Sequence, residues 1–295
     1  MHDDGGDSMK EGGVLVVKIG GSCFSDKKVP KSLFIDVIDG VCEQLQSIGM
    51  PVVIVHGGGS YGHPIAKKYA IHDGHRDDIP DQTMGFCLTH DAMVELNHVI
   101  VGRFLEHGLP AYPVQTSAVF VHRNGVVINS NLAPVDALLD QGFMPVLFGD
   151  SVIDESRGFG IISGDSIVVE LANGLDHEVN NIVYLMDVDG LHDKNPKLDE
   201  TATLFTEVFL KGERMLVQQD ETLVSIEDAI DQADGSIDVT GGILKKIRAL
   251  RYIKRHDITI ALINGRAASR LAALIAGDDV PRTRIVIQDG DDADG

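Results

Sequence analysis

Short, continuous apolar runs alternate with longer amphipathic stretches along most of the chain. Val14–Val17, Pro51–Val55 and Pro145–Phe148 are runs of the first kind, and none alternates between apolar and polar positions. A strand with one solvated face would show a period of two, so these strands are predicted to be buried on both faces. The pattern predicts an α/β fold, an open and mostly parallel sheet sandwiched by helices.

The stretches between these runs predict the other elements. Residues 32–47 and 83–107 are expected to be helical. Asn124-Gly125 separates two short apolar runs and predicts a β-hairpin, because both residues favour the positive φ that such a turn needs. Further elements are expected as a helix from Ser163-Gly164-Asp165 to about Leu175, a strand over Asn181–Met186, a helix from Gly241-Gly242 to about Arg255, a strand over Ile258–Ile263, a helix near Ser269–Ala276 and a strand over Thr283–Ile287.

The two ends differ from the rest of the chain. Residues 1–12 and 289–295 are rich in Asp and Gly and lack periodicity, so they are expected to be disordered acidic tails. No long linker or repeat interrupts residues 13–288, which predicts one unit with two lobes, about 13–177 and about 178–288.

Composition narrows the classes of function. The formal net charge of −20 argues against a nucleic-acid binder, which needs a basic face. No apolar run reaches the ~20 residues of a membrane helix, and the first residues do not resemble a signal peptide, so we expect a cytoplasmic protein. The 3 cysteines are scattered without metal-ligand spacing and are expected to be reduced thiols. The charge itself favours a heavily solvated surface, as in proteins from salt-rich cytoplasm.

Glycine-rich turns follow several predicted strands. Lys18–Ser22, His56–His63 and Ser163–Asp165 come after apolar runs, and Thr240–Gly242 is expected to open a helix. Ligands of open α/β sheets bind at the carboxyl ends of strands, and helix N-termini attract anions. Glycine also lets the backbone approach a phosphate closely. The turns therefore indicate a phosphate-binding site.

Two common phosphate motifs do not account for these turns. The Walker A pattern GxxxxGK[ST] is absent from the sequence. Residues 57–62 match GxGxxG, but the acidic residues about 20 positions on, Asp77 and Asp78, lie in a polar stretch and not at a strand end. A dinucleotide site is therefore not expected.

Several segments resemble the amino-acid kinase superfamily. These are Lys-Ile-Gly-Gly-Ser at 18–22, Asp-Val-Asp-Gly at 187–190 with Asn-Pro-Lys at 195–197, and Asp-Val-Thr-Gly-Gly at 238–242 followed by Lys246. Within the superfamily, His-Gly-Gly-Gly-Ser-Tyr-Gly-His at 56–63 resembles a segment of the isopentenyl phosphate kinases, with Tyr61 in place of the usual Phe. The resemblance spans about residues 14–287.

This resemblance implies that ATP phosphorylates isopentenyl phosphate to isopentenyl diphosphate, in isoprenoid biosynthesis of the mevalonate type. Mg²⁺ is expected with ATP and held mainly by phosphates and water, with no all-protein metal site. The lobe of about 13–177 would hold the phosphate substrate and that of about 178–288 the nucleotide. A homodimer is implied as well. A phosphate monoester is already largely dianionic at neutral pH, so positioning and charge neutralisation would suffice for in-line transfer.

The resemblance also assigns roles to residues. Lys18 and Lys246 would contact ATP phosphates, Asp165 would orient the lysines, and Lys27 would stabilise the transition state, with the adjacent Lys28 as the alternative. The remaining candidates are Gly58 and Gly164 for the substrate and Gly20, Gly21, Ser22, Gly59, Asp187 and Gly242 for ATP. Asp187, like Asp189, could instead cap the turn in which it lies.

His63 is expected to grip the substrate phosphate. An imidazole donates a strong hydrogen bond to phosphate and can become cationic beside it. Pro64 is a favoured first helical residue, so His63 is expected at a helix N-terminus, whereas His56 is expected to pack at the strand end. A helix that carries Phe86, Cys87 and Met93 could provide a pocket for the alkyl tail, but apolar residues on a helix are more often part of the core, so only the phosphate end of the site is predicted.

Alternative functions remain open at this point. A kinase of this fold could act on another phosphate or phosphonate, as the fosfomycin kinases do. The fold also serves in non-catalytic binding and storage. The presence of Lys18, Lys27 and Lys246 favours catalysis.

Overall fold

The computed structural model describes residues 9–26, 28–219, 222–231 and 237–288. The tails expected at 1–8 and 289–295 lie outside these ranges, and so does Lys27. Residues 9–12 were expected to belong to a tail, but this was wrong. Met9 is buried, and the backbone N–H of Lys10 donates to Asn181 Oδ1 at 2.9 Å.

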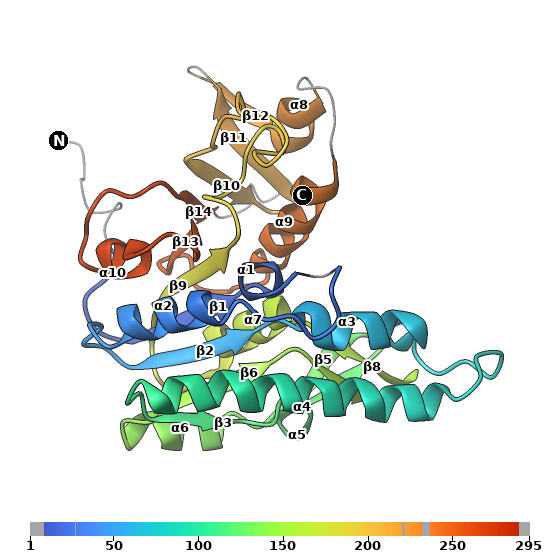
Figure 1. The fold of residues 1–295 in the computed structure, drawn as a ribbon. Coiled ribbons are helices and arrows are strands. Elements are labelled where there is room, and N and C mark those ends of the chain that lie inside the picture. Colours follow the sequence, from blue (N-terminus) through green and yellow to red (C-terminus); the bar gives the residue numbers. More distant parts are fainter. Residues whose placement is uncertain (1–8, 27, 220–221, 232–236, 289–295) are drawn as a thin grey trace, which may run out of the picture.

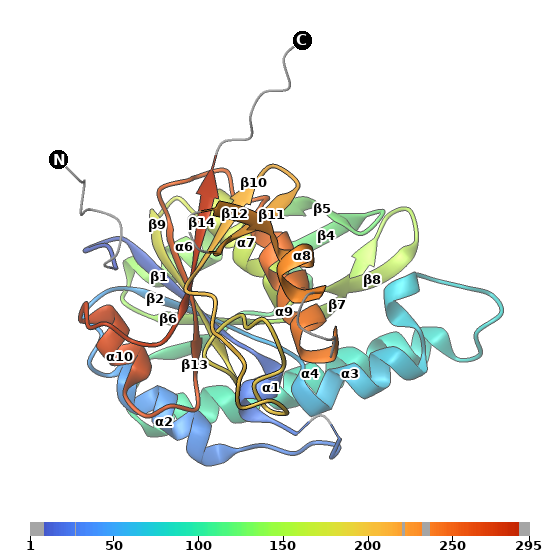
Figure 2. The same ribbon diagram turned by 90° about the horizontal axis from the view of Figure 1, so that it is seen from above.

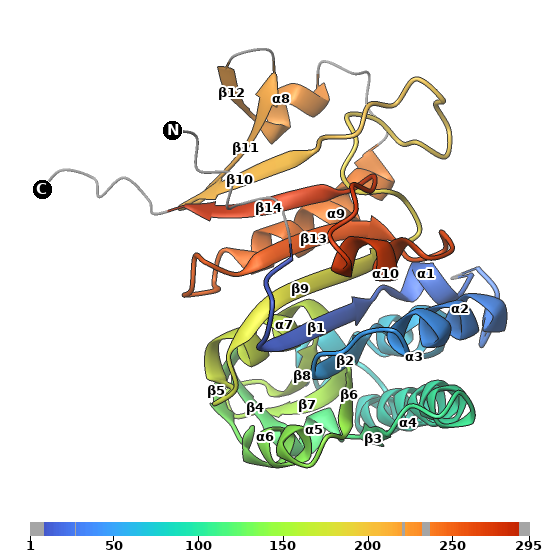
Figure 3. The ribbon, with the colours of Figure 1, turned by 90° about the vertical axis from the view of Figure 1, so that its left-hand side faces the viewer.

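A 10-stranded sheet forms the centre of the protein. In sheet order its strands are β12 (Thr222–Ser225), β11 (Arg214–Gln219), β10 (Glu207–Lys211), β14 (Thr283–Gln288), β13 (Thr259–Asn264), β9 (Val179–Met186), β1 (Val14–Ile19), β2 (Val52–His56), β6 (Met144–Phe148) and β3 (Ala111–Pro113). Figure 3 shows the strands stacked in this order. Every neighbouring pair from β13 to β3 is parallel, whereas β14 pairs antiparallel with β13, and β10, β11 and β12 form an antiparallel edge.

A second, 4-stranded sheet lies beside the first. Its strands are β5 (Val126–Ser130), β4 (Phe120–Arg123), β7 (Asp150–Asp154) and β8 (Gly158–Ile162). The predicted hairpin joins β4 to β5. Asn124 and Gly125 have φ of 53° and 78°, the positive values that this turn requires.

Helices cover both faces of the large sheet (Figures 1 and 2). In the described residues the helices are α1 (Gly21–Phe24), α2 (Ile35–Leu45), α3 (Gly59–Lys68), the 3₁₀ turn η1 (Ile71–Asp73), α4 (Gln82–Glu106), α5 (Thr116–Val119), α6 (Ala133–Asp140), α7 (Gly164–Gly174), α8 (Ile226–Asp231), α9 (Ile237–Leu250) and α10 (Arg270–Ile275). Side chains of α2, α4 and α10 belong to the hydrophobic cluster on one face, and those of α6, α7, α8 and α9 to the cluster on the other. The expected α/β sandwich is confirmed.

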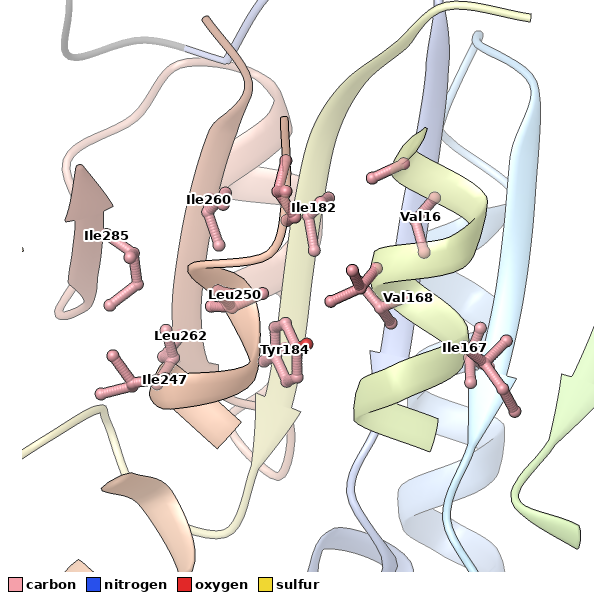
Figure 4. Packing of buried hydrophobic residues seen from close by; sticks show 14 of the residues in the cluster. Val16, Ile167, Val168, Ile182, Tyr184, Ile247, Leu250, Ile260, Leu262 and Ile285 are labelled. Atoms are coloured by element: carbon pink, nitrogen blue, oxygen red, sulfur yellow. The ribbon is translucent and has the colours of Figure 1, made fainter. Parts of the chain in front are cut away.

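The central strand β1 explains the continuous apolar runs. Successive side chains of a strand point to opposite faces, and here each face has its own core. Val16 contributes to the cluster that Ile167 and Val168 of α7 also join, as Figure 4 shows, whereas Leu15 and Val17 belong to the cluster on the other face. Both sets of positions must therefore be apolar.

Some predicted boundaries were wrong. The helix expected from Gly241-Gly242 to about Arg255 instead runs from Ile237 to Leu250. Residues 191–231, which carry many charges and were assigned no elements, contain β10, β11, β12 and α8. None of the helices in the described ranges has both the length and the apolar character needed to cross a membrane. All 3 cysteines are free thiols, as expected.

Candidate active site

The glycine turns after β1 and β2 lie against each other. Gly57 donates its backbone N–H to Ile19 O at 3.0 Å. A Cβ placed on Gly21 would lie only 2.5 Å from the backbone nitrogen of Gly59, which itself has a φ of +48°. No larger side chain fits between the two turns, so glycine is required for their close approach.

These turns open into two cavities that share a wall. The inner cavity has a volume of about 160 Å³ and lies between the turns, α3, α4 and the start of α7. The outer cavity, of about 660 Å³, extends from the turn after β1 towards α9 and the loop after β9. Gly20, Ser22 and Lys246 line both cavities. The inner wall also includes the expected residues Lys18, Gly21, Gly58, His63, Gly164 and Asp165, and the outer wall includes Lys28, Asp187 and Gly242.

Two lysines meet one carboxylate where the cavities join. Lys18 Nζ lies 2.8 Å from Asp165 Oδ1, and Lys246 Nζ lies 3.9 Å from Asp165 Oδ2. Burial alone would raise the pKa of Asp165, but the charges of Lys18, Lys246 and His63 and the hydrogen bond from Lys18 outweigh it and lower this pKa. Asp165 is therefore anionic and holds both ammonium groups at the junction.

Lys18 is 4% exposed, which is unusual for a lysine. Besides its ion pair, its ammonium lies 5.5 Å from the ring centroid of buried Tyr184 on β9. The α7 helix brings Asp165 to it, and Ser163 caps that helix by accepting the N–H of Ser166 at 3.0 Å. The position of Lys18 is therefore determined by packing and charge together.

His63 lines the inner cavity, as predicted, but not at a helix N-terminus. Helix α3 begins at Gly59, so Pro64 stands inside the helix. Proline has no N–H to donate to Ser60 O, and that carbonyl instead accepts the backbone N–H of Lys31 at 3.3 Å. The orphaned helical carbonyl is thus satisfied by the neighbouring loop.

His56 has the structural role expected of it. It is fully buried, stacks on Phe148 and lies 3.1 Å from Asn97 Oδ1 through Nε2. Burial lowers the pKa of His56 to about 4, although hydrogen bonds to Gly57 and Asn97 oppose the shift. The imidazole is therefore neutral near pH 7 and packs against the strand end.

The far wall of the inner cavity includes one of the three residues considered for the alkyl tail. Met93 lines it, but Phe86 packs instead in a separate cluster with Ile71 and Phe159, and Cys87 is exposed. The remaining apolar wall residues, which the sequence analysis missed, are Ala66, Ile161 and Ile162.

Two polar side chains on this wall form hydrogen bonds with other groups of the protein. Thr89 Oγ1 donates to Gly85 O at 2.8 Å. The Asp150 carboxylate lies 2.9 and 3.0 Å from His90 Nδ1 and accepts the N–H of Ser151 at 2.8 Å. Burial raises the pKa of Asp150, whereas the bond and charge of His90 oppose the rise. The hydroxyl proton of Thr89 and the carboxylate of Asp150 are thus engaged within the protein.

A second charged cluster lies in the outer cavity. Ser22 Oγ donates to Asp187 Oδ1 at 2.9 Å, and Lys197 pairs with the other oxygen of Asp187. Burial opposes ionisation of Asp187, but the hydrogen bonds from Lys197 and Ser22 prevail and lower its pKa. The glycine turn at Ser22 is thereby tied to the loop after β9.

The structure brings together nearly all of the described candidates. Gly242 lines the outer cavity from within α9, and it does not mark the start of that helix as expected. Gly59 lines neither cavity and instead supports the turn. Lys28 lines the outer cavity, while the prediction for Lys27 falls outside the described residues.

Two cationic residues of the outer cavity had no role in the sequence analysis. Lys197 was quoted only as part of an Asn-Pro-Lys motif, and Arg266 was not singled out. Arg266 follows the predicted strand that ends near Ile263, and position after a strand is the only signal that could have indicated it.

Comparisons with known proteins agree with this geometry. The sequence model of the amino acid kinase family matches residues 13–264. The isopentenyl phosphate kinase of Methanocaldococcus jannaschii is 31% identical over 278 residues, which are 90% of this chain and 96% of that protein. The isopentenyl phosphate kinase of Methanothermobacter thermautotrophicus is 28% identical over 280 residues, with coverages of 92% and 98%.

A solved structure of isopentenyl phosphate kinase has the same fold. It superposes with a TM-score of 0.75 at 25% sequence identity, and the match covers 92% of this chain and 100% of that one. Family match, relatives and structure agree over nearly the whole chain. The chain therefore belongs to the amino acid kinase family, in the group of the isopentenyl phosphate kinases.

Proposed function

We propose that the protein transfers the γ-phosphoryl group of ATP to isopentenyl phosphate and produces isopentenyl diphosphate and ADP, a step of isoprenoid biosynthesis of the mevalonate type. The observation that carries the proposal is the Lys18–Asp165–Lys246 cluster where the two cavities join. The inner cavity would hold the acceptor and the outer cavity the nucleotide, so the transferred group would pass between the lysines.

The chemistry needs no general base from the protein. An oxygen of the acceptor phosphate attacks Pγ, the bond between Pγ and the β,γ-bridging oxygen breaks, and ADP leaves with that oxygen. Since the acceptor is largely dianionic at pH 7, the protein has only to align two anions and neutralise charge. Lys18 and Lys246 would neutralise the transferring group, and Lys27 or Lys28 would add a third cation.

His63 would bind the acceptor phosphate. The imidazole lines the inner cavity within the electrostatic reach of Asp165. Backbone N–H groups at Gly58 and at Gly164, which begins α7, would supply further donors. On the donor side, Gly20, Gly21, Ser22 and Gly242 would approach ATP, with Asp187 holding Ser22 in place.

Magnesium would enter with the nucleotide. Among the described residues, no group of three or more His, Cys, Asp or Glu side chains could hold a metal ion. Mg²⁺ commonly keeps several waters and binds through substrate phosphates, which suits this donor set. When bound, it would neutralise charge on the β- and γ-phosphates.

The inner cavity suits a short, apolar tail. Its volume of about 160 Å³ is well below the 660 Å³ of the outer cavity, which favours an acceptor much smaller than the nucleotide. Because Thr89 and Asp150 use their polar atoms within the protein, the far wall offers mainly apolar contacts. Burial contributes about 0.8 kcal/mol per methylene, so a five-carbon tail would add substantially to affinity.

We further propose that the enzyme is a homodimer that works in the cytoplasm. Strand β3 forms an edge of the large sheet, and beside it Tyr112 and Phe143 are 50% and 43% exposed with ring centroids 6.2 Å apart. An apolar pair at a sheet edge is a suitable surface for a second copy.

The test is ADP release with Mg-ATP at low and high KCl. The acceptors are isopentenyl phosphate, dimethylallyl phosphate, fosfomycin, acetylglutamate and UMP. We expect selective turnover of the five-carbon monophosphates. Preferential turnover of fosfomycin would favour the phosphonate kinase, and ATP binding without turnover of any acceptor would refute the proposed reaction.

A further inference from the structure

The Gly20–Ser22 segment, for which we propose a role in ATP binding, continues into helix α1. This helix is a single helical turn, Gly21–Phe24. A helix this short cannot satisfy its own backbone, because the last four carbonyls of any helix lack intrahelical partners. Its carbonyls must find donors elsewhere or face water. The turn is thus held in place by groups outside itself.

Each of these carbonyls has an identified donor. Gly21 O accepts the backbone N–H and the hydroxyl of Ser25, at 3.1 and 2.7 Å. Phe24 O accepts the N–H of Phe34 at 2.7 Å. Both donors come from the loop that follows α1 directly.

The remaining two carbonyls depend on one distant side chain. Arg266 Nη2 donates to Ser22 O at 2.6 Å, and Arg266 Nε donates to Cys23 O at 3.0 Å. The guanidinium also lies 4.8 Å from the centroid of the Phe34 ring. Its planar fork matches two adjacent carbonyls, and its positive charge is favourable at the C-terminal end of a helical turn.

The backbone next to Arg266 also packs closely against α1. Gly265 donates its N–H to Met186 O at 2.8 Å, and a Cβ on Gly265 would lie 2.7 Å from Cys23 Sγ. The loop after β13, which belongs to the second half of the chain, therefore contacts α1 directly. On its other side, α1 abuts Gly59 through Gly21.

We propose that Arg266 is a positioning residue for phosphoryl transfer: it fixes the carbonyl side of α1 and thereby aims the Gly20–Ser22 turn at the transferring phosphate. The inference rests on the proposed use of this turn in ATP binding. Losing Arg266 would leave two carbonyls of the turn without their donors and free the turn to reorient. Turnover and nucleotide affinity would then fall, while the inner cavity kept its acceptor site.

The experiment compares Arg266→Ala, Arg266→Lys and Arg251→Ala with the unaltered protein. Arg251 is a matched control, because its guanidinium also lies over an aromatic ring, that of Tyr252 at 4.9 Å, and pairs with Glu213, outside both cavities. We expect Arg266→Ala to lower kcat at least tenfold with KM for isopentenyl phosphate within twofold. Arg266→Lys is expected to recover part of this loss, and Arg251→Ala should leave both values unchanged.

Two further readouts separate this inference from the proposed function. Hydrogen exchange of a peptide covering residues 19–25 should accelerate in Arg266→Ala, and affinity for ADP should fall, whether or not isopentenyl phosphate is the acceptor. Guanidinium at millimolar concentration should restore part of the lost affinity, whereas KCl at equal concentration should not. Unchanged exchange and ADP affinity in a folded Arg266→Ala variant would overturn the positioning role. Absent turnover of isopentenyl phosphate by the unaltered protein would instead refute the reaction.

Discussion

The two cavities of the site are built differently, although they share three wall residues. The inner cavity is small, lies between turns that follow parallel strands, and has an apolar far wall. The outer cavity is larger and is lined by charged side chains from loops far apart in the chain, among them Lys28, Asp187, Lys197 and Arg266. We therefore expect shape to select the acceptor in the inner cavity and charge to hold ATP in the outer cavity.

This contrast predicts that substitutions should separate into three kinds. Changes at the junction should chiefly lower turnover, changes in the inner cavity should weaken binding of the acceptor but not of ATP, and changes in the outer cavity should weaken binding of ATP but not of the acceptor. A substitution that changed both affinities equally would break the comparison.

The largest effect is expected at the junction. Lys18→Met removes the buried ammonium that lies 2.8 Å from Asp165, whose ion pair with Lys246 is longer, at 3.9 Å. Loss of one preorganised charge at a transferring group costs roughly 10²–10³ in kcat, and we expect a loss in this range from steady-state ADP release. Lys67→Met, at an exposed position of α3, should have wild-type kinetics. Retention of more than a tenth of kcat by Lys18→Met would exclude Lys18 from the transfer step.

His63→Ala tests the inner cavity. A hydrogen bond to a charged group is worth about 1.5–3 kcal/mol, so KM for isopentenyl phosphate should rise at least tenfold while KM for ATP stays within twofold. His98→Ala changes an exposed histidine of α4 and provides the control. An equal rise in KM for both ligands would contradict the role assigned to His63.

Lys197→Ala tests the outer cavity with the opposite selectivity. It removes one cation and leaves the Asp187 carboxylate uncompensated where ATP phosphates would lie. KM for ATP should rise about three- to tenfold, and KM for isopentenyl phosphate should stay within twofold. Lys254→Ala, also at an exposed site, should change neither. A rise in KM for the acceptor would show that the two cavities are not independent.

The smallest effect is expected outside both cavities, at His177. Its ring nitrogens lie 2.8 Å from Asp136 and 3.2 Å from Asp140, and the hydrogen bond to Asp136, followed by the two nearby charges, raises the pKa of His177. Because the folded pKa exceeds the unfolded value of about 6.5, the pair stabilises the fold fully below that pH and loses this contribution as pH rises through the folded pKa.

Thermal unfolding of His177→Gln and the unaltered protein would check this dependence. Their Tm values should differ by about 2 °C near pH 5.5, which corresponds to about 1 kcal/mol, and should converge above pH 9. A constant difference across this range would assign the effect to packing and not to charge. Kinetic constants should not change, since His177 lines neither cavity.

Elements with a strong local signal were predicted well from the sequence. The double-sided apolar pattern of Val14–Val17 indicated a central strand, and Asn124-Gly125 indicated a hairpin. The start of α9 was misplaced because Gly241-Gly242 resembled a helix N-terminus, although the helix continues through both residues from Ile237.

The residues of the candidate site also divide into those with a local signal in the sequence and those without one. Lys18 and His63 lie in or beside glycine turns, which made them identifiable. Arg266 stands 243 residues from Cys23, whose carbonyl it binds, and no pattern in the sequence connects them. Asp150 and His90 belong to different elements and meet only in the folded state. Residues that act through contacts between distant segments could not be predicted from local pattern.

The contact between Gly21 and Gly59 has a consequence for how this scaffold can acquire new substrates. A side chain at Gly21 would collide with backbone, and Gly59 has a conformation that L-residues rarely adopt, so neither position can serve as a variable site. Ala66 and Ile161, in contrast, line the wall of the inner cavity as residues that already carry side chains. Divergence towards other phosphate esters would therefore proceed through substitutions in that wall, with the two turns inherited unchanged.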